Sequence, residues 1–258
     1  MKKLFATILA VAMLLMSCTV FAATDISDGV IRVEGMGALT NTNAINGYRA
    51  AKVDAMRNAL EEVQGVRIDS DTTVQDSITA SDVIRSRVNG LIKGAQVVKK
   101  YQDKDGYHVI LEIPVRGTSS LAAAVIPERT TPVVPLAPAK SYVPEIPVST
   151  GPYTGLIVDC SGLGLETAMA AGVFTPDGKM VYGEDNFTHE EIINRGYVSY
   201  AKSLTSGVSR AGSNPLIVRA QSIKGFVNPV VSNTDAAKIM VENEKTSFLQ
   251  QGNVVFVK

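Results

Sequence analysis

Two hydrophobic periodicities run along the first half of the chain. Val30 to Gly37 alternates apolar or small positions with polar ones, which predicts a strand. Apolar residues then recur at three- and four-residue spacing between residues 45 and 63, which predicts a long helix capped by the polar run 40–43 and ended by Gly65. The expected buried stripe is Ile45, Tyr48, Ala51, Ala55, Ala59 and Val63, widened by Met56 and Leu60. Its small alanines would let the helix lie close against a sheet.

A second helix and a hairpin complete this region. Residues 82–93 predict a helix ending at Gly94, and its expected buried residues are Val83, Ile84, Val88, Leu91 and Ile92. Residues 95–102 and 107–116 flank a four-residue turn that ends in Gly106, and they predict two paired strands. Residues 66–68 are a short strand candidate, and a polar segment follows at 70–77. The pattern predicts a domain over residues 28–116, an antiparallel sheet covered by two helices.

The second half of the chain also mixes strand and helix signals. Strands are predicted at 155–160, 167–174, 179–182, 196–201, 215–225 and 254–257, and the second and third of them flank the turn Pro176-Asp177-Gly178. A short helix is predicted at 189–195. A longer one opens at Ser232, in a Ser-x-x-Asp capping pattern, and is expected to stop at Gly252. Residues 153–258 are therefore predicted to form a second domain of the same class.

Seven of the eleven prolines fall between Pro127 and Pro152. Proline lacks a backbone donor, so this spacing disfavours helices and central strands. We interpret residues 117–152 as a semi-stiff, polyproline-like linker; a rigid loop packed on a single domain is the alternative. The predicted fold class is α+β: two small domains, each an antiparallel or mixed sheet covered by helices, joined by this Pro-rich linker.

The first 22 residues read as a signal peptide. Lys2 and Lys3 precede the apolar stretch 4–16, which is shorter than the roughly 20 residues that span a membrane. Cleavage after Ala22 would release a soluble chain. Alternatively, Leu15-Met16-Ser17-Cys18 resembles a lipobox in which Cys18 would be lipidated, although Met16 replaces the small residue usual there. Both interpretations stay open.

Either interpretation of the signal leaves Cys160 without a partner thiol, and its apolar surroundings predict a buried small hydrophobe.

Composition and motifs argue against several classes of function and assign none. The 25 Lys and Arg balance 25 Asp and Glu, which argues against a nucleic-acid partner. His189 begins a zinc-protease pattern, but Ile193 stands where a second imidazole is needed. Gly162-Leu163-Gly164 lacks the third glycine of a dinucleotide site and indicates a loop that needs free backbone torsions. We expect no catalytic residue, metal or cofactor; Ser161 and Glu166 are candidate ligand contacts only.

An ordered set of motifs carries a family resemblance. It comprises the Ala-rich helix 50–60, Gly65-Val66, a Ser/Thr-rich stretch, the run 90–98 and the hairpin Asp105-Gly106-Tyr107. Residues 46–115 thereby resemble the small bacterial surface lipoproteins that include the flagellar protein FlgP and, more loosely, the N-terminal domain of the flagellar assembly protein FlgT. The resemblance implies a non-enzymatic envelope protein, often anchored in the outer membrane, of which some members build rings around the flagellar basal body. The second domain is similar to a module of uncharacterised envelope proteins and implies no activity.

These observations lead to one main functional hypothesis and one alternative. The main hypothesis is an exported protein of the periplasm or outer membrane, with a structural or assembly role that is exerted through contacts with envelope proteins or through self-association. The alternative is a periplasmic module that binds a small ligand or peptidoglycan through polar groups near Ser161 and Glu166. A hydrolase with paired carboxylates ranks last.

Overall fold

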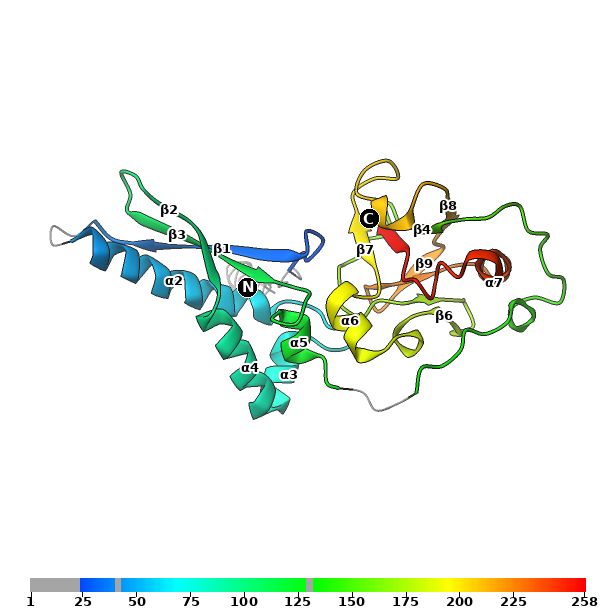
Figure 1. Cartoon of the computed structure of the whole chain (residues 1–258), viewed down its shortest axis with the longest axis horizontal. Coiled ribbons are helices and arrows are strands. Elements are labelled where there is room, and N and C mark those ends of the chain that lie inside the picture. The colour runs from blue at the N-terminus through cyan, green and yellow to red at the C-terminus, as the bar shows by residue number, and fades with distance from the viewer. Residues whose placement is uncertain (1–23, 40–42, 129–131) are drawn as a thin grey trace, which may run out of the picture.

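A computed structural model describes residues 24–39, 43–128 and 132–258. The expected signal peptide and Cys18 lie outside the described residues. The described residues 24–39 and 43–126 form an elongated part that we call the arm, and residues 132–258 form a rounder part that we call the body (Figure 1).

The arm is built on a three-stranded antiparallel sheet in the order β1-β3-β2. Its strands are β1 (Val30–Gly37), β2 (Gln96–Gln102) and β3 (Tyr107–Pro114). Helix α2 (Ala44–Gln64) covers one face, and alternate residues of β3 from Tyr107 to Ile113 are buried. The strand expected at 30–37 and the hairpin are confirmed. Figure 1 shows the helix running along the whole sheet.

Helix α2 packs unusually close to β1. A Cβ added to Gly35 would lie 2.0 Å from the backbone nitrogen of Ala55, and one on Gly37 would lie 2.2 Å from the carbonyl oxygen of Gly47. Ala51, Ala55 and Ala59 are fully buried, as the alanine stripe predicted. Ile45 was wrongly assigned to this stripe: it is 58% exposed, because the first turn of the helix reaches past the end of β1.

Three shorter helices complete the arm: α3 (Val74–Ala80), α4 (Asp82–Lys93) and α5 (Leu121–Val125). Helix α4 has the expected bounds and ends at Gly94, but Val83 is exposed rather than buried. Helix α3 was not expected, since its sequence is mostly polar; Thr73 and Asp76 close a capping box at its start. Residues 66–68 form isolated bridges rather than a strand.

The body holds two four-stranded sheets. One is wholly parallel, in the order β7-β11-β4-β8: β4 (Gly155–Asp159), β7 (Ser199–Ala201), β8 (Pro215–Arg219) and β11 (Val254–Val257). The other is mixed, in the order β6-β5-β10-β9: β5 (Val173–Phe174), β6 (Met180–Tyr182), β9 (Ser222–Lys224) and β10 (Asn228–Val230). Helices α6 (His189–Arg195) and α7 (Asn233–Thr246) and the 3-10 helices η1 (Ala139–Ser141), η2 (Glu184–Asn186) and η3 (Ser209–Ala211) complete the body.

The α+β class is therefore confirmed, but one antiparallel or mixed sheet was expected in this part, and the body has two sheets, one of them wholly parallel. The apolar runs of β4 and β11 are buried at every position, as is usual in parallel sheets covered on both faces. The strand expected over 215–225 is divided into β8 and β9 by a turn. Helix α7 stops before Gly252, because Ser247 takes a left-handed conformation and caps it.

Arm and body share one hydrophobic core and several backbone hydrogen bonds. Met169 and Ala170 of the body donate to the carbonyls of Arg67 and Ile68, at 3.1 and 2.7 Å. The Arg116 guanidinium, at the end of the arm, donates to the carbonyls of Arg195, at 2.8 Å, and of Val198 in the body. The buried cluster includes Val63 and Val66 from the arm together with Leu156 from the body.

The Pro-rich segment lies along the body. Ala139 and Tyr142 are buried, and the Tyr142 hydroxyl donates to the carbonyl of Met180 at 3.1 Å. The fully buried carboxylate of Glu242 accepts hydrogen bonds from the Ser149 hydroxyl and the Thr150 backbone, at 2.7 and 2.6 Å. These contacts correspond to a packed loop, the alternative that the proline spacing left open, rather than to a free spacer.

The close packing of α2 predicts a sharp difference between two glycines. Gly35→Ala should destabilise the protein by roughly 1–3 kcal/mol, because the added methyl has to displace helix backbone. Gly90→Ala, in α4, should instead stabilise it by about 0.5–1 kcal/mol, since helix interiors favour alanine and nothing lies within 4 Å of the added carbon. Urea unfolding measures both; equal midpoints for the two variants would contradict the packing argument.

Candidate interaction surface

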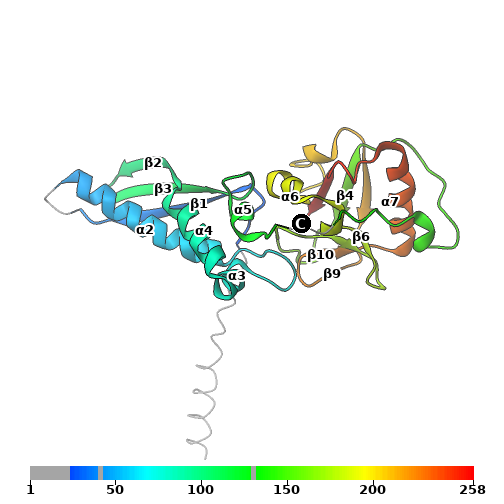
Figure 2. The ribbon, with the colours of Figure 1, turned by 60° about the horizontal axis from the view of Figure 1, so that its bottom comes forward.

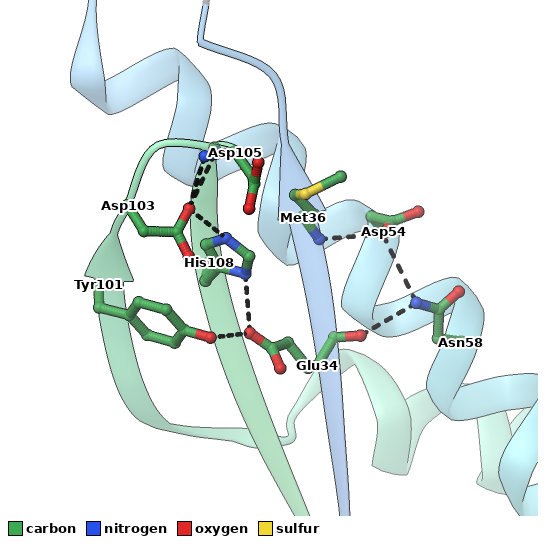
Figure 3. Close-up of polar contacts among 9 residues, drawn as sticks. Glu34, Met36, Asp54, Asn58, Tyr101, Asp103, Asp105 and His108 are labelled. Carbon is green, nitrogen blue, oxygen red and sulfur yellow. Dashed lines mark hydrogen bonds and ion pairs between the residues drawn. The ribbon is translucent and has the colours of Figure 1, made fainter.

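The open face of the arm sheet carries a polar cluster that spans all three strands (Figure 3). The two ring nitrogens of His108, on β3, contact carboxylates on either side: Nδ1 lies 2.8 Å from Glu34 of β1, and Nε2 lies 3.1 Å from Asp103 of the hairpin turn. Tyr101 of β2 donates its hydroxyl hydrogen to the same Glu34 carboxylate. Its ring stacks on His108 with the centroids 4.5 Å apart. The register brings these residues together: Tyr101 lies opposite His108 on β2, and Glu34 lies two residues before Met36, the partner of His108 on β1, and therefore on the same face.

The cluster perturbs the acidity of its members. Desolvation alone would lower the pKa of His108, but hydrogen bonds to Asp103 and Glu34 and their negative charges outweigh it and raise that pKa. The Tyr101 hydrogen bond is the largest cause of a lowered pKa at Glu34, and the backbone amide of Asp105 is the largest at Asp103. The same Glu34 contact raises the pKa of Tyr101 to about 12. The His108 ring, between two carboxylates, therefore ties the three strands together.

Beside the cluster, this face carries further charged side chains and the apolar Met36, which is 51% exposed. Arg32 pairs with Glu112 at 2.8 Å across β1 and β3. Lys99 lies with its ammonium 4.8 Å from the centre of the Tyr101 ring. Such a face is usual for an antiparallel sheet that buries only one side. The side chains of the open face therefore do not form an apolar docking surface.

The two edges of the sheet differ from one another. Along β1, side chains of α2 occupy the outward backbone groups: Asp54 accepts from the Met36 amide and Asn58 donates to the Glu34 carbonyl, both at 3.0 Å (Figure 3). Along β2, no described element lies beyond the strand in either view (Figures 1 and 2). Most of its side chains are exposed, including Val98 at 47%. The arm thus has one edge at which α2 side chains pair two backbone groups and a second edge that no described element covers.

The residues that the sequence nominated for ligand contact have structural roles in the body. The Glu166 carboxylate is bound by the Arg67 guanidinium at 2.6 Å, and the same guanidinium lies over the Phe226 ring. Ser161 donates its backbone N–H to Asp159, and its carbonyl accepts from Arg219. Among the described residues, no hydrogen bond joins Ser161 to Glu166. The Arg67–Glu166 pair links positions 99 residues apart, a separation for which local sequence gives no signal.

Other motifs have the local roles expected of them. Gly162 and Gly164 have φ values of +79° and +71°, which confirms a loop that needs free backbone torsions. Cys160 is buried, as expected, and burial raises the pKa of its thiol to about 12. In the described ranges, no three His, Cys, Asp or Glu side chains are grouped to hold a metal ion. Nor is any helix there long and apolar enough to cross a membrane.

Two family models match the chain, and they fall on the two halves of the fold. Residues 27–114, nearly the whole arm, match the LPP20 lipoprotein family. The arm is similar to a bacterial lipoprotein. Residues 155–258, in the body, match the second domain of Treponema pallidum Tp0624. No curated protein shows a significant match. The first match supports the general part of the resemblance, a small bacterial lipoprotein family, and does not extend to FlgP or FlgT.

The His108 cluster predicts a pH dependence with a definite sign. The raised pKa of His108 stabilises the fold fully below its unfolded value near 6.5, and this contribution is lost as pH rises through the folded value. The lowered pKa values of Glu34 and Asp103 stabilise the fold above about pH 4, and this contribution is lost as pH falls through their folded values. The cluster therefore contributes most between roughly pH 4.5 and 6.5.

An NMR titration of the His108 ring tests this sign. The midpoint should lie above 6.5 and should fall in Glu34→Gln, which removes one carboxylate. Glu112→Gln is the matched control on the same face, because Glu112 pairs with Arg32 instead. A wild-type midpoint below 6.5, or an equal change in the two variants, would refute the assignment.

Proposed function

We propose that this protein is a non-enzymatic, lipid-anchored protein of the bacterial envelope that acts through protein–protein contacts made by its arm. The signal-peptide pattern and the LPP20 match support export and the envelope. The observation that carries the contact role is the open edge of β2, beside an edge that Asp54 and Asn58 close. An unpaired strand edge offers a row of backbone donors and acceptors to an extended segment of another chain.

The chemistry of β2 specifies the kind of partner. Lys99 and Lys100 are adjacent on the strand, and both are exposed. Antiparallel pairing of two β2 strands would bring these like charges together, so self-association through this edge is disfavoured. An acidic extended segment of a different envelope protein fits better. Given the resemblance to flagellar lipoproteins, a component of the flagellar basal body is the specific candidate.

Site-specific photo-crosslinking in the native organism tests the edge. A benzoylphenylalanine at Val98, which is 47% exposed on β2, should yield an adduct with a partner protein. The same probe at Val53, 68% exposed on the outer side of α2, is the matched control and should not. Lys99→Glu with Lys100→Glu should weaken the Val98 adduct, whereas Lys104→Glu with Lys140→Glu should leave it unchanged. Equal adducts at both probe positions, or none at Val98, would refute the proposal that the β2 edge binds a partner.

Lipidation is tested separately with labelled palmitate. The wild type should incorporate label and Cys18→Ala should not, because the acylated sulfur is the anchor. Cys160→Ala is the control and should label like the wild type, since that thiol is buried in the fold. Labelling of Cys18→Ala would show that the chain is acylated elsewhere, and an unlabelled wild type would indicate cleavage after Ala22.

The alternative function is binding of a small ligand or of peptidoglycan. Arg67 occupies the Glu166 carboxylate, so Glu166 is committed to the contact between arm and body. The observation that favours the alternative lies elsewhere, in a cavity beside Asn228.

A further inference from the structure

A cavity of about 260 Å³ lies where the arm meets the body. The loop of residues 69–72, between α2 and α3, forms one wall, and β5, β6 and β10 of the body form the other. Figure 2 shows this loop reaching from the arm towards β9 and β10. The main-chain bond from Ala170 to Ile68, at 2.7 Å, fixes the loop next to the body. The cavity therefore has walls from both parts of the chain.

One buried side chain of the cavity wall has an unused donor. Asn228 is only 7% exposed, and its Oδ1 accepts a hydrogen bond from the Gly172 amide at 2.8 Å. Its Nδ2 donates to none of the described residues. Because Asn228 lines the cavity, this amide donor is available to a molecule bound there. An acceptor on a bound molecule would satisfy it.

The arm loop offers acceptors on the opposite wall. Asp69 Oδ1 receives the backbone N–H groups of Asp71 and Thr72, both at 2.8 Å, which fixes the loop and orients the carboxylate. Its Oδ2 accepts from none of the described residues. Asp71 Oδ2 receives the Ser70 hydroxyl at 3.0 Å. Free carboxylate oxygens thus lie on the wall across from the amide donor.

An apolar surface completes the cavity. Phe174 and Met180 contribute it, and the Lys224 ammonium lies 5.1 Å from the centre of the Phe174 ring. Position 172 has no room for a side chain, because a Cβ added to Gly172 would lie 2.8 Å from the Tyr182 carbonyl oxygen. A ligand for this site needs one apolar face and a rim that both donates and accepts hydrogen bonds.

We propose that this cavity binds a single sugar ring, free or as the end of a glycan chain. Ring hydroxyls both donate and accept, so one can satisfy Asn228 Nδ2 while another donates to Asp69. The C–H face of the ring packs on Phe174 and Met180. Pockets that combine apolar walls with a few placed polar groups are the usual form of small-molecule sites. This function is additional to the contact role of β2 and does not depend on it.

Titration of the purified mature protein with N-acetylglucosamine, followed by amide NMR, tests the site. Saturable shifts should appear at Gly172 and at the Asn228 side chain. Asn228→Asp keeps the acceptor for Gly172 and removes the donor, so affinity should fall about tenfold, the loss of one hydrogen bond. Phe174→Leu should also weaken binding. Glu166→Gln, at the junction but not lining the cavity, is the control and should bind like the wild type.

Glucosamine and magnesium chloride distinguish a sugar site from an acidic one. Saturable binding of N-acetylglucosamine that Asn228→Asp weakens and Glu166→Gln does not supports the proposal. Binding of magnesium but of neither sugar would overturn it, as would wild-type affinity in Asn228→Asp or no saturable binding at all. None of these results bears on crosslinking at β2, so the two proposals fail independently.

Discussion

The close approach of helix α2 to strand β1 determines most of what the arm presents to its surroundings. Gly35 and Gly37 remove the side chains that would separate the two elements, and the buried alanines of the helix fit the space that remains. Gly47 of the helix leaves room for the Tyr107 ring of β3. At this distance the short side chains of Asp54 and Asn58 reach around the strand and pair its outward backbone groups. Longer packing residues would leave those groups beyond reach. The same contact that buries one face of the sheet therefore closes one of its edges and leaves β2 as the open one.

The junction explains how an elongated arm can hold a fixed orientation. Arg116 and Arg210 donate to main-chain carbonyls of residues 195–198, and Arg210 also donates to Gly252. Burial lowers the pKa of Arg116, because a desolvated cation is disfavoured; carbonyl dipoles, rather than a carboxylate, surround it. A guanidinium suits this role since its planar donors can bind several carbonyls at once. Together with the bonds of Arg67 and Ile68 and the shared core, this makes the arm an extension of the body.

Sequence patterns anticipated the parts of this fold that depend on local periodicity. The alternation in β3 and the three- and four-residue spacing of α2 and α4 report which side of each element is buried, so these elements were predicted closely. The apolar pattern did not predict helix α3, because capping by Thr73 and Asp76, rather than an apolar stripe, defines its start. The candidate sites depend on contacts between distant positions. Neither the meeting of Glu34 with His108 nor that of Asp69 with the wall holding Asn228 leaves a local trace.

The polar face and the open edge of the arm are physically coupled through β2. Few side chains of this strand are buried, so apolar contacts hold it to β3 less firmly than α2 holds β1. Tyr101 compensates, since its hydroxyl reaches Glu34 across the intervening strand and its ring rests on His108. The ionic cluster thereby fixes the strand that an incoming segment would pair with. An edge strand positioned by polar contacts, instead of by burial, can stay exposed, here with an irregularity in its register between Val97 and Lys99, without its side chains having to form a core.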